Sequence, residues 1–335
     1  MKVLVTGAAG MLGSGLVPAL IGAGHDVVAT DINMSDRRPW GPGGAQLLPL
    51  DVRSWDAIKA AFRDVVPDLV CHLAAETSLE YSDANEEHAF ATNTLATKFV
   101  ALEAGRSNVP LVYISTAGVF DGHKPGPYHE WDTPNPINVY GRTKYEGELL
   151  VERYATRSYI VRAGWMVGGG AKDHKFVAKI IEQLRAGCTT VYAVGDKLGT
   201  PTYVPDFART LLGLVETESF GRYHMACEGW ASRYDVAHEI LEVLGLDDVV
   251  QLEEVGSDFF ADEYPSARPR SEIMRNLHLD LQGLNTMRRW QPALAEYLRH
   301  EFGDVVRDRG RTRIVDLVES SPDRRLGALQ EEAAK

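Results

Sequence analysis

Short apolar runs and amphipathic stretches alternate along the first half of the chain. Residues 2–6 are a β-branched run, and the apolar residues between 11 and 23 recur near helical spacing. The same alternation predicts strands at residues 26–31, 46–51, 68–74, 110–116 and 158–162, and helices at 55–65, 86–105 and 139–155. Because strands that alternate with helices form βαβ units, the pattern predicts an α/β fold. We expect a Rossmann-like, doubly wound parallel sheet covered on both faces.

The pattern weakens after residue 165. Helices are expected at 175–186, 205–215, 233–244 and 292–302, and short strands at 190–194 and 222–226. We therefore expect a first domain over residues 1–165, to which parts of 188–230 return, and a smaller interleaved α/β lobe over 166–302. Residues 303–335 are charge-rich with few aromatics and are expected to form a solvated tail.

Composition narrows the classes of function. The 335 residues carry 35 Lys and Arg against 47 Asp and Glu, a net charge of −12, which disfavours non-specific nucleic-acid binding. No apolar run is long enough to predict a membrane-spanning helix. The three cysteines lie far apart, which disfavours a disulfide framework or a zinc site. Glycines interrupt the apolar N-terminus, so this segment is expected to be part of the folded domain rather than a signal peptide. The protein is therefore expected to be cytoplasmic.

A glycine motif lies where the first predicted strand meets the first predicted helix. Gly7, Gly10 and Gly13 form a GxxGxxG pattern. Gly7 permits a tight turn, Gly10 lets the backbone approach a pyrophosphate, and Gly13 allows close packing of helix and strand. A phosphate would meet free N–H groups at the helix start, so the motif, with Met11 and Leu12, is expected to bind a dinucleotide.

Acidic residues end the next two predicted strands. Asp31 follows the last motif glycine by 18 residues, where a carboxylate can bind a ribose 2′-hydroxyl. This favours NAD(H), because the 2′-phosphate of NADP(H) would meet like charge. Arg37 and Arg38 could accept that phosphate, so NADP(H) stays open. Asp51 and Val52 are expected to contact the adenine.

A tyrosine and a lysine stand four residues apart in the helix predicted before the sixth strand. Tyr140 and Lys144 therefore share one helix face, where the ammonium would stabilise the phenolate and lower its pKa. The preceding strand ends in two hydroxyls, Ser115 and Thr116, at the edge where doubly wound sheets bind ligands. Together these residues predict carbonyl reduction: Thr116 positions the carbonyl, Tyr140 donates the proton, and the cofactor supplies hydride.

The arrangement resembles the extended short-chain dehydrogenase/reductases over roughly residues 1–302. GxxGxxG, the strand end His72-Leu-Ala-Ala75, Ser115-Thr116 and the Tyr140/Lys144 pair occur in that family's order and spacing. The resemblance implies that Thr116, Tyr140 and Lys144 are catalytic, and that Tyr140 and Lys144 also contact the cofactor. It adds three residues to the cofactor site, namely Leu73, Ala74 and Ala75.

Within that superfamily the chain is most similar to the dTDP-4-dehydrorhamnose reductase family. Four stretches carry this narrower resemblance, residues 74–77, 134–141, 199–202 and 267–269. It implies a nucleotide-sugar site built from the loop at 121–138 and the C-terminal lobe. The residues expected to contact the substrate are Thr77, Ala117, Gly118, Trp165, Arg268 and Arg270. The two arginines could grip a diphosphate, because a guanidinium is a planar fork of donors.

The chain departs from that family's pattern at several positions, including Lys175-Phe176, where an Asn-Phe pair is expected. Ala117-Gly118 replaces Asp-Tyr after the catalytic threonine and is closer to nucleotide-sugar epimerases. Arg270-Ser271-Glu272 replaces Gly-Asn-Ser, which changes an expected wall of the substrate site. Gly15 stands where some relatives place a glutamate that binds Mg²⁺, so no metal is expected.

Three functions follow from these observations. The first is an NAD(P)H-dependent reductase of a 4-keto-6-deoxy nucleotide sugar, the second an epimerase that retains NAD, and the third a non-catalytic regulatory subunit on the same fold. The expected partner is a nucleotide sugar, with no nucleic acid and no membrane. Extended members pair through helices like those expected at 86–105 and 139–155, so the resemblance also implies a homodimer.

Overall fold

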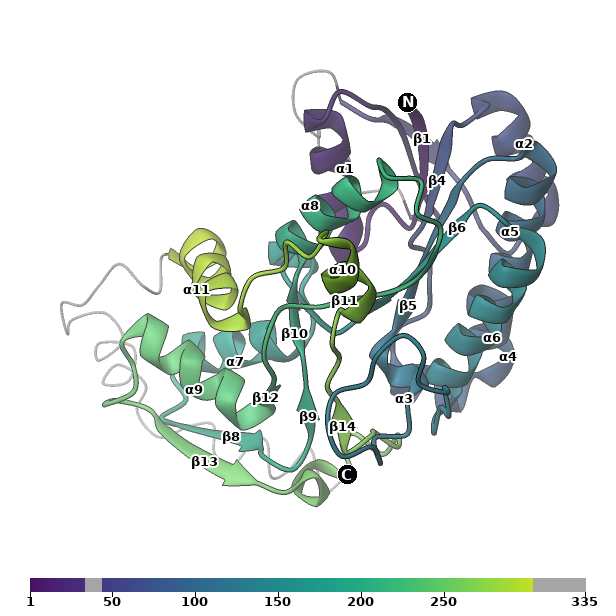
Figure 1. The fold of residues 1–335 in the computed structure, drawn as a ribbon. Helices are drawn as coiled ribbons and strands as arrows, with labels where there is room; N and C mark the ends of the chain where they lie inside the picture. Colours follow the sequence, from purple (N-terminus) through teal and green to yellow (C-terminus); the bar gives the residue numbers. More distant parts are fainter. Residues whose placement is uncertain (34–43, 304–335) are drawn as a thin grey trace.

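The computed structural model describes residues 1–33 and 44–303 (Figure 1). Its centre is a seven-stranded sheet with the strand order β11-β6-β5-β4-β1-β2-β3, and every neighbouring pair is parallel. The strands are β1 (Lys2–Thr6), β2 (Asp26–Asp31), β3 (Gln46–Pro49), β4 (Leu69–His72), β5 (Leu111–Thr116), β6 (Ser158–Ala163) and β11 (Gly221–Met225). The doubly wound parallel sheet predicted from the hydrophobic pattern is confirmed.

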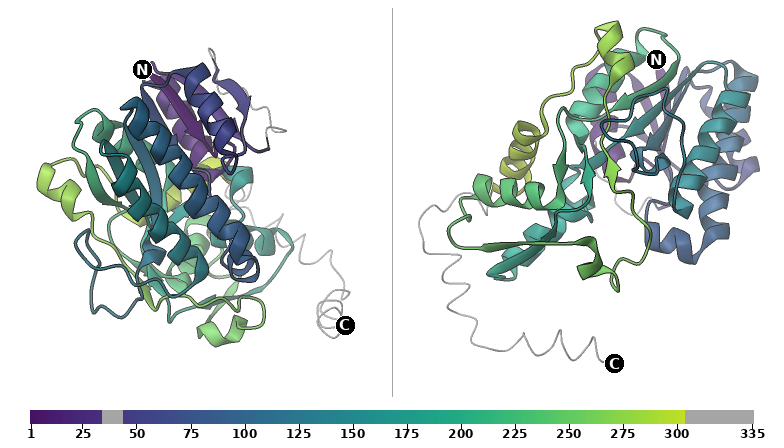
Figure 2. Two further views of the ribbon diagram at one scale, coloured as in Figure 1. Left: turned by 90° about the vertical axis from the view of Figure 1, so that its right-hand side faces the viewer. Right: turned by 60° about the horizontal axis from the view of Figure 1, so that its bottom comes forward.

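Helices cover both faces of this sheet (Figures 1 and 2). On one face lie α1 (Met11–Gly22) and α8 (Val204–Val215), and on the other α2 (Trp55–Val65), α5 (Ala96–Ser107) and α6 (Val139–Tyr154). Gly15 sits where α1 meets α8: a Cβ there would come within 2.4 Å of Val204 Cγ1. A glutamate at this position would therefore collide with α8, which gives a packing reason for the glycine.

The second half of the chain supplies a sheet edge and a smaller lobe, seen at the lower left of Figure 1. β11 pairs with β6 at the edge of the main sheet. The lobe contains α7 (Phe176–Arg185), α9 (Arg233–Leu244) and α11 (Trp290–Glu301), while α10 (Leu277–Gln282) packs on β11. Its small sheets pair β7 (Trp165–Val167) with β10 (Pro201–Tyr203), β8 (Thr190–Val194) with β13 (Gln251–Val255), and β9 (Leu198–Gly199) with both β12 (Ala231–Ser232) and β14 (Ser271–Glu272). The predicted division into two ranges stays a prediction.

The helix predicted at 86–105 differs from the structure. It consists of α4 (Glu86–Ala89), a π-helical turn (Phe90–Leu95) and α5. The turn contains the buried Asn93, whose amide bonds the backbone of Glu76 at 2.8 and 3.0 Å and the Thr143 hydroxyl at 3.0 Å. The irregular turn thus ties the segment after β4 to α6, in keeping with the placement of π-bulges near functional sites.

A short helix, α3 (Leu79–Ala84), and the two-residue strands β9, β12 and β14 were not predicted. In the part of the chain that the structure describes, no helix is long and apolar enough to cross a membrane. The predicted phosphate acceptors Arg37 and Arg38, and the tail after residue 303, lie outside the described residues.

Candidate active site

The glycine motif forms the turn between β1 and α1. Gly7 has φ +68°, and a Cβ on it would come within 2.5 Å of the Ala74 nitrogen. Gly13 packs equally closely against the backbone, because a Cβ added there would lie 2.2 Å from the Ala8 carbonyl oxygen. Gly10 is the N-cap of α1 and has no side chain that could accept a hydrogen bond from the first N–H groups of the helix. The turn therefore fits a dinucleotide phosphate at the end of α1.

Asp31 faces this turn from the end of β2. Its Oδ2 accepts a hydrogen bond from the Ala9 N–H at 3.0 Å, and its Oδ1 accepts one from the Asn33 N–H at 3.1 Å. A carboxylate has about four acceptor sites, so these two bonds leave capacity for a ribose hydroxyl. Asp31 thus both orders the turn and presents a negative charge beside it.

Asp51 lies at the end of the neighbouring strand and is held by Arg53. Nη2 of Arg53 donates to Asp51 Oδ2 at 2.7 Å, and these hydrogen bonds lower the pKa of the carboxyl. Val52 is buried, and Leu73, Ala74 and Ala75 continue from the end of β4. Leu73 donates its N–H to the Thr6 carbonyl oxygen at 3.1 Å, which sets this segment beside the glycine turn.

Thr116 and Tyr140 meet where β5 ends and α6 begins. Asn138 caps α6, accepting the Gly141 N–H at 2.7 Å, so Tyr140 falls in the first helical turn. Thr116 lies close enough to Tyr140 to lower the pKa of the phenol, and Thr116 Oγ1 accepts the Gly118 N–H at 3.1 Å. The structure therefore brings together a phenol and a hydroxyl that can hold one carbonyl oxygen between them.

The electrostatic setting of Tyr140 differs from the expected one. Burial raises its pKa to about 12, although the nearby Thr116 hydroxyl lowers it, and the charges of Glu272 and Glu76 raise it further. Lys144 does not reverse this, because its Nζ lies over the Tyr113 ring, 4.2 Å from the ring centre. Tyr140 is thus a neutral phenol at neutral pH, which is the form a proton donor requires.

Lys144 is one turn further along α6 and is 3% exposed. Burial lowers its pKa to about 7, while the charge of Glu148 raises it. In the described structure the ammonium is therefore only partly populated at neutral pH.

We expect the free energy of unfolding of the wild type, relative to Lys144→Met, to rise between about pH 7 and pH 10. The native pKa of Lys144 is depressed, so in this window the unfolded chain binds more protons than the native one and stability increases with pH. The slope is at most about 1.4 kcal/mol per pH unit. Urea unfolding at several pH values measures it, with the exposed Lys59→Met as the control. Parallel curves for wild type and Lys144→Met would contradict the assignment.

The predicted substrate residues occupy different settings. Ala117 and Gly118 are buried in the turn after β5, whereas Thr77 is exposed. Arg268 is engaged by Glu80 of α3, with Nη2 2.6 Å from Oε1, and Arg270 is exposed. An arginine that is already paired must exchange partners to bind a diphosphate, so the two arginines differ in availability.

The loop at 121–138 packs against the segment that carries these arginines. Asn138 Nδ2 donates to the Ala267 carbonyl oxygen at 2.8 Å, and a Cβ on Gly122 would come within 2.6 Å of the Arg270 nitrogen. The two segments implied by the resemblance to form a substrate site are therefore neighbours.

Two charged residues at this site were not predicted as site residues. The guanidinium of Arg233, at the start of α9, stacks on Trp165 with its carbon 3.6 Å from the ring centre. Trp165 Nε1 donates to Glu272 Oε2 at 2.8 Å. No local sequence motif identifies Arg233 or Glu272 as a site residue. In the sequence, Glu272 stands out only because it departs from the family pattern.

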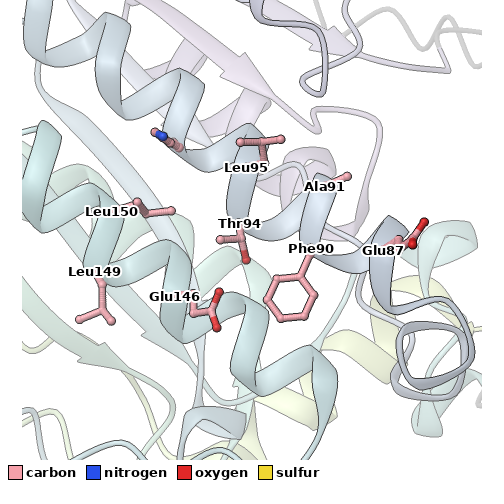
Figure 3. Close-up of a pocket in the computed structure, with 9 residues that line it drawn as sticks. Glu87, Phe90, Ala91, Thr94, Leu95, Glu146, Leu149 and Leu150 are labelled. Atoms are coloured by element: carbon pink, nitrogen blue, oxygen red, sulfur yellow. The ribbon is translucent and has the colours of Figure 1, made fainter.

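A cavity of about 660 Å³ lies elsewhere, on the outer face of the helices from α4 to α6 (Figure 3). Its lining is largely apolar and comprises Glu87, Phe90, Ala91, Thr94, Leu95, Lys98, Glu146, Leu149 and Leu150. None of the predicted catalytic or ligand-binding residues lines it.

Comparisons with known proteins agree with this geometry. The family model described as RmlD substrate binding domain matches residues 1–302. A dTDP-4-dehydrorhamnose reductase of Mycobacterium tuberculosis is 32% identical over 89% of this chain and 92% of its own length. A dTDP-4-dehydrorhamnose reductase crystal structure from Clostridium acetobutylicum has a TM-score of 0.80 at 32% identity, covering 90% of this chain and 99% of that one. A Bacillus anthracis reductase of the same name, solved with NADP, has a TM-score of 0.79 at 28% identity, covering 89% and 99%.

Proposed function

The chain belongs to the RmlD substrate binding domain family, and we propose that it is an NAD(P)H-dependent reductase of a 4-keto-6-deoxy nucleotide sugar. The observation that carries the proposal is that Thr116, at the end of β5, and Tyr140, in the first turn of α6, meet at the same sheet edge at which β1 leads into the glycine turn. Relatives named as dTDP-4-dehydrorhamnose reductase and dTDP-4-keto-6-deoxy-D-glucose reductase support the substrate class.

In the proposed reaction, the chain orients the C4 carbonyl and delivers a proton to its oxygen. Thr116 and Tyr140 hold that oxygen, and Tyr140 gives up its hydroxyl proton as the alkoxide develops. Bound at the glycine turn, the nicotinamide cofactor supplies the hydride. Lys144, one turn further along α6, would hold the nicotinamide ribose. The nucleotide diphosphate is a remote handle whose binding energy orients the reacting carbon.

The test mixes purified protein with a dTDP-4-keto-6-deoxyhexose and either NADH or NADPH, and follows the near-ultraviolet absorbance of the reduced cofactor. We expect its loss to match the alcohol formed. No loss with either cofactor would refute the reductase for this substrate.

A second candidate is an epimerase that keeps NAD bound through oxidation and re-reduction of the sugar. The observation that favours it is the Ala117-Gly118 turn directly after Thr116. The family model and the relatives named as dTDP-4-dehydrorhamnose reductase favour the reductase over it. Release of NAD on denaturing the purified protein would support the epimerase.

We propose that NADH is the preferred cofactor and expect it to bind about tenfold more tightly than NADPH, a difference of about 1.4 kcal/mol. The reason is the Asp31 carboxylate beside the glycine turn, which a 2′-phosphate would meet as like charge. Asp31→Asn should bring the affinities for NADH and NADPH closer together, as measured by fluorescence titration of both cofactors. Asp26→Asn, exposed at the other end of β2, is the matched control. Tighter NADPH binding by the wild type would contradict the preference.

We further propose a homodimer through the apolar cavity on α4 to α6. Leu95 and Leu149 line it and are each 45% exposed, although both are large apolar side chains. Leu149→Asp should raise the dimer dissociation constant at least about tenfold in analytical ultracentrifugation, because it places a charge in an apolar interface. Leu281→Asp, at an apolar residue of α10 that is 69% exposed, should leave it unchanged. A monomeric wild type would refute the proposal.

A further inference from the structure

Glu272 is an acidic residue set into the wall of the proposed substrate site. It lies in β14, which pairs with β9, and β9 in turn pairs with β12, the strand that leads into Arg233. Trp165 lies against this small sheet: a Cβ on Gly199 would come within 2.1 Å of its ring. The backbone pairing and the indole therefore fix where the half-buried Glu272 side chain can go.

The two carboxylate oxygens of Glu272 have different surroundings. Oε2 accepts the Trp165 Nε1 hydrogen bond at 2.8 Å, whereas in the described part of the chain no hydrogen bond reaches Oε1. A Cβ on Gly118 would lie 3.4 Å from Thr116 Oγ1 and 3.6 Å from Glu272 Oε1. The glycine thus leaves open the space between the hydroxyl that positions the carbonyl and an unused acceptor oxygen.

We propose that Glu272 determines substrate specificity by accepting, through Oε1, a hydrogen bond from the hydroxyl on the carbon next to the reacting carbonyl. The inference rests on the proposed reductase function and deepens it. In a 4-keto-6-deoxyhexose, C5 carries the methyl group, so the neighbouring hydroxyl is the one on C3. The substrate class is therefore a nucleotide-linked 3-hydroxy-4-ketohexose.

The charges around Glu272 favour a neutral donor over an ammonium group. Burial raises the pKa of Glu272, and the Trp165 hydrogen bond and the charges of Arg233, Arg268 and Lys175 oppose that rise. The hydrogen bonds of Arg268 go to other acceptors, Glu80 among them, so its charge compensates Glu272 without occupying Oε1. These positive charges would repel a further cation, whereas a hydroxyl needs only a free lone pair on Glu272 Oε1.

The test compares kcat/KM for a dTDP-4-keto-6-deoxyhexose and its 3-deoxy analogue. We expect the wild type to prefer the hydroxylated substrate at least about 100-fold, because a site built to bond a hydroxyl rejects the analogue that lacks it. Glu272→Ala should bring the two substrates within about tenfold by slowing only the hydroxylated one. Glu272→Gln, whose amide oxygen still accepts, should fall between. Glu254→Gln, exposed on β13, should behave as the wild type.

The results of this comparison separate the Glu272 proposal from the proposed reductase function. A folded Glu272→Ala variant, with unchanged circular dichroism and cofactor affinity, that keeps the wild-type preference would overturn the proposal. If that variant does not fold, an unchanged preference in Glu272→Gln overturns it instead. Equal turnover of both substrates by the wild type overturns the Glu272 proposal and leaves the reductase standing. Turnover of neither substrate overturns the reductase itself, and the Glu272 proposal with it.

Discussion

Replacing Tyr140 with phenylalanine should lower kcat by about 10²- to 10⁴-fold while leaving cofactor affinity unchanged. The hydroxyl is the only part removed, and it is the group whose pKa the neighbouring Thr116 lowers. Because burial raises the pKa of Tyr140 to about 12, the phenol is protonated throughout the physiological range. Steady-state kinetics with saturating cofactor measures the change in kcat, and fluorescence titration measures the affinity.

Tyr145→Phe is the matched control for Tyr140→Phe. Tyr145 lies on the same helix but packs against the cluster of Val119, Phe120 and Tyr128, away from the proton to be transferred. It should keep nearly full activity. If Tyr140→Phe retained more than about a tenth of wild-type kcat, another group would have to donate the proton. If the wild type had no turnover at all but bound cofactor, the regulatory-subunit reading would gain support.

The first half of the fold could be predicted because its signals are local. Residues 3–5 are fully buried on both faces of the sheet, so they read as a continuous apolar run, and the helices between the strands show their own period. The pairing of Thr116 with Tyr140 could also be anticipated, since parallel strands and the helices that follow them meet at one sheet edge. These features depend on short stretches of sequence and on one topological rule.

The small sheets of the second lobe and the charged pair Arg233 and Glu272 could not be predicted in the same way. β9, β12 and β14 are two residues long and pair across distances of more than 30 residues in the chain, so no window of sequence carries their pattern. The pKa of Tyr140 was expected to fall because Lys144 is one helical turn away. In the folded chain, burial instead raises the pKa of Tyr140, and the Lys144 ammonium lies over the Tyr113 ring. Proximity in sequence does not report desolvation.

A buried ion pair beneath the active site should make Arg162→Met strongly destabilising. Arg162 and Glu148 are both fully buried, and the guanidinium makes two hydrogen bonds to the carboxylate, at 2.9 and 2.7 Å. Removing the arginine leaves the buried Glu148 with the Ser115 hydroxyl, which donates to it at 2.5 Å, and with Arg222 Nε at 3.7 Å, which is too far to replace the two lost hydrogen bonds. We expect a loss of about 3–5 kcal/mol in the free energy of unfolding. Urea denaturation measures this loss.

The double variant Arg162→Met/Glu148→Leu separates a charge effect from a packing effect. If the loss comes from the carboxylate that has lost its two Arg162 hydrogen bonds, removing Glu148 as well should recover much of the stability, since replacing a whole buried pair by apolar groups is often tolerated. A double variant no more stable than Arg162→Met would point to packing instead. The recovery should not extend to activity. Glu148 raises the pKa of Lys144, and through Ser115 it joins the end of β5 to α6. A double variant that folds but reduces its substrate slowly would show that this pair supports the active site as well as the stability of the fold.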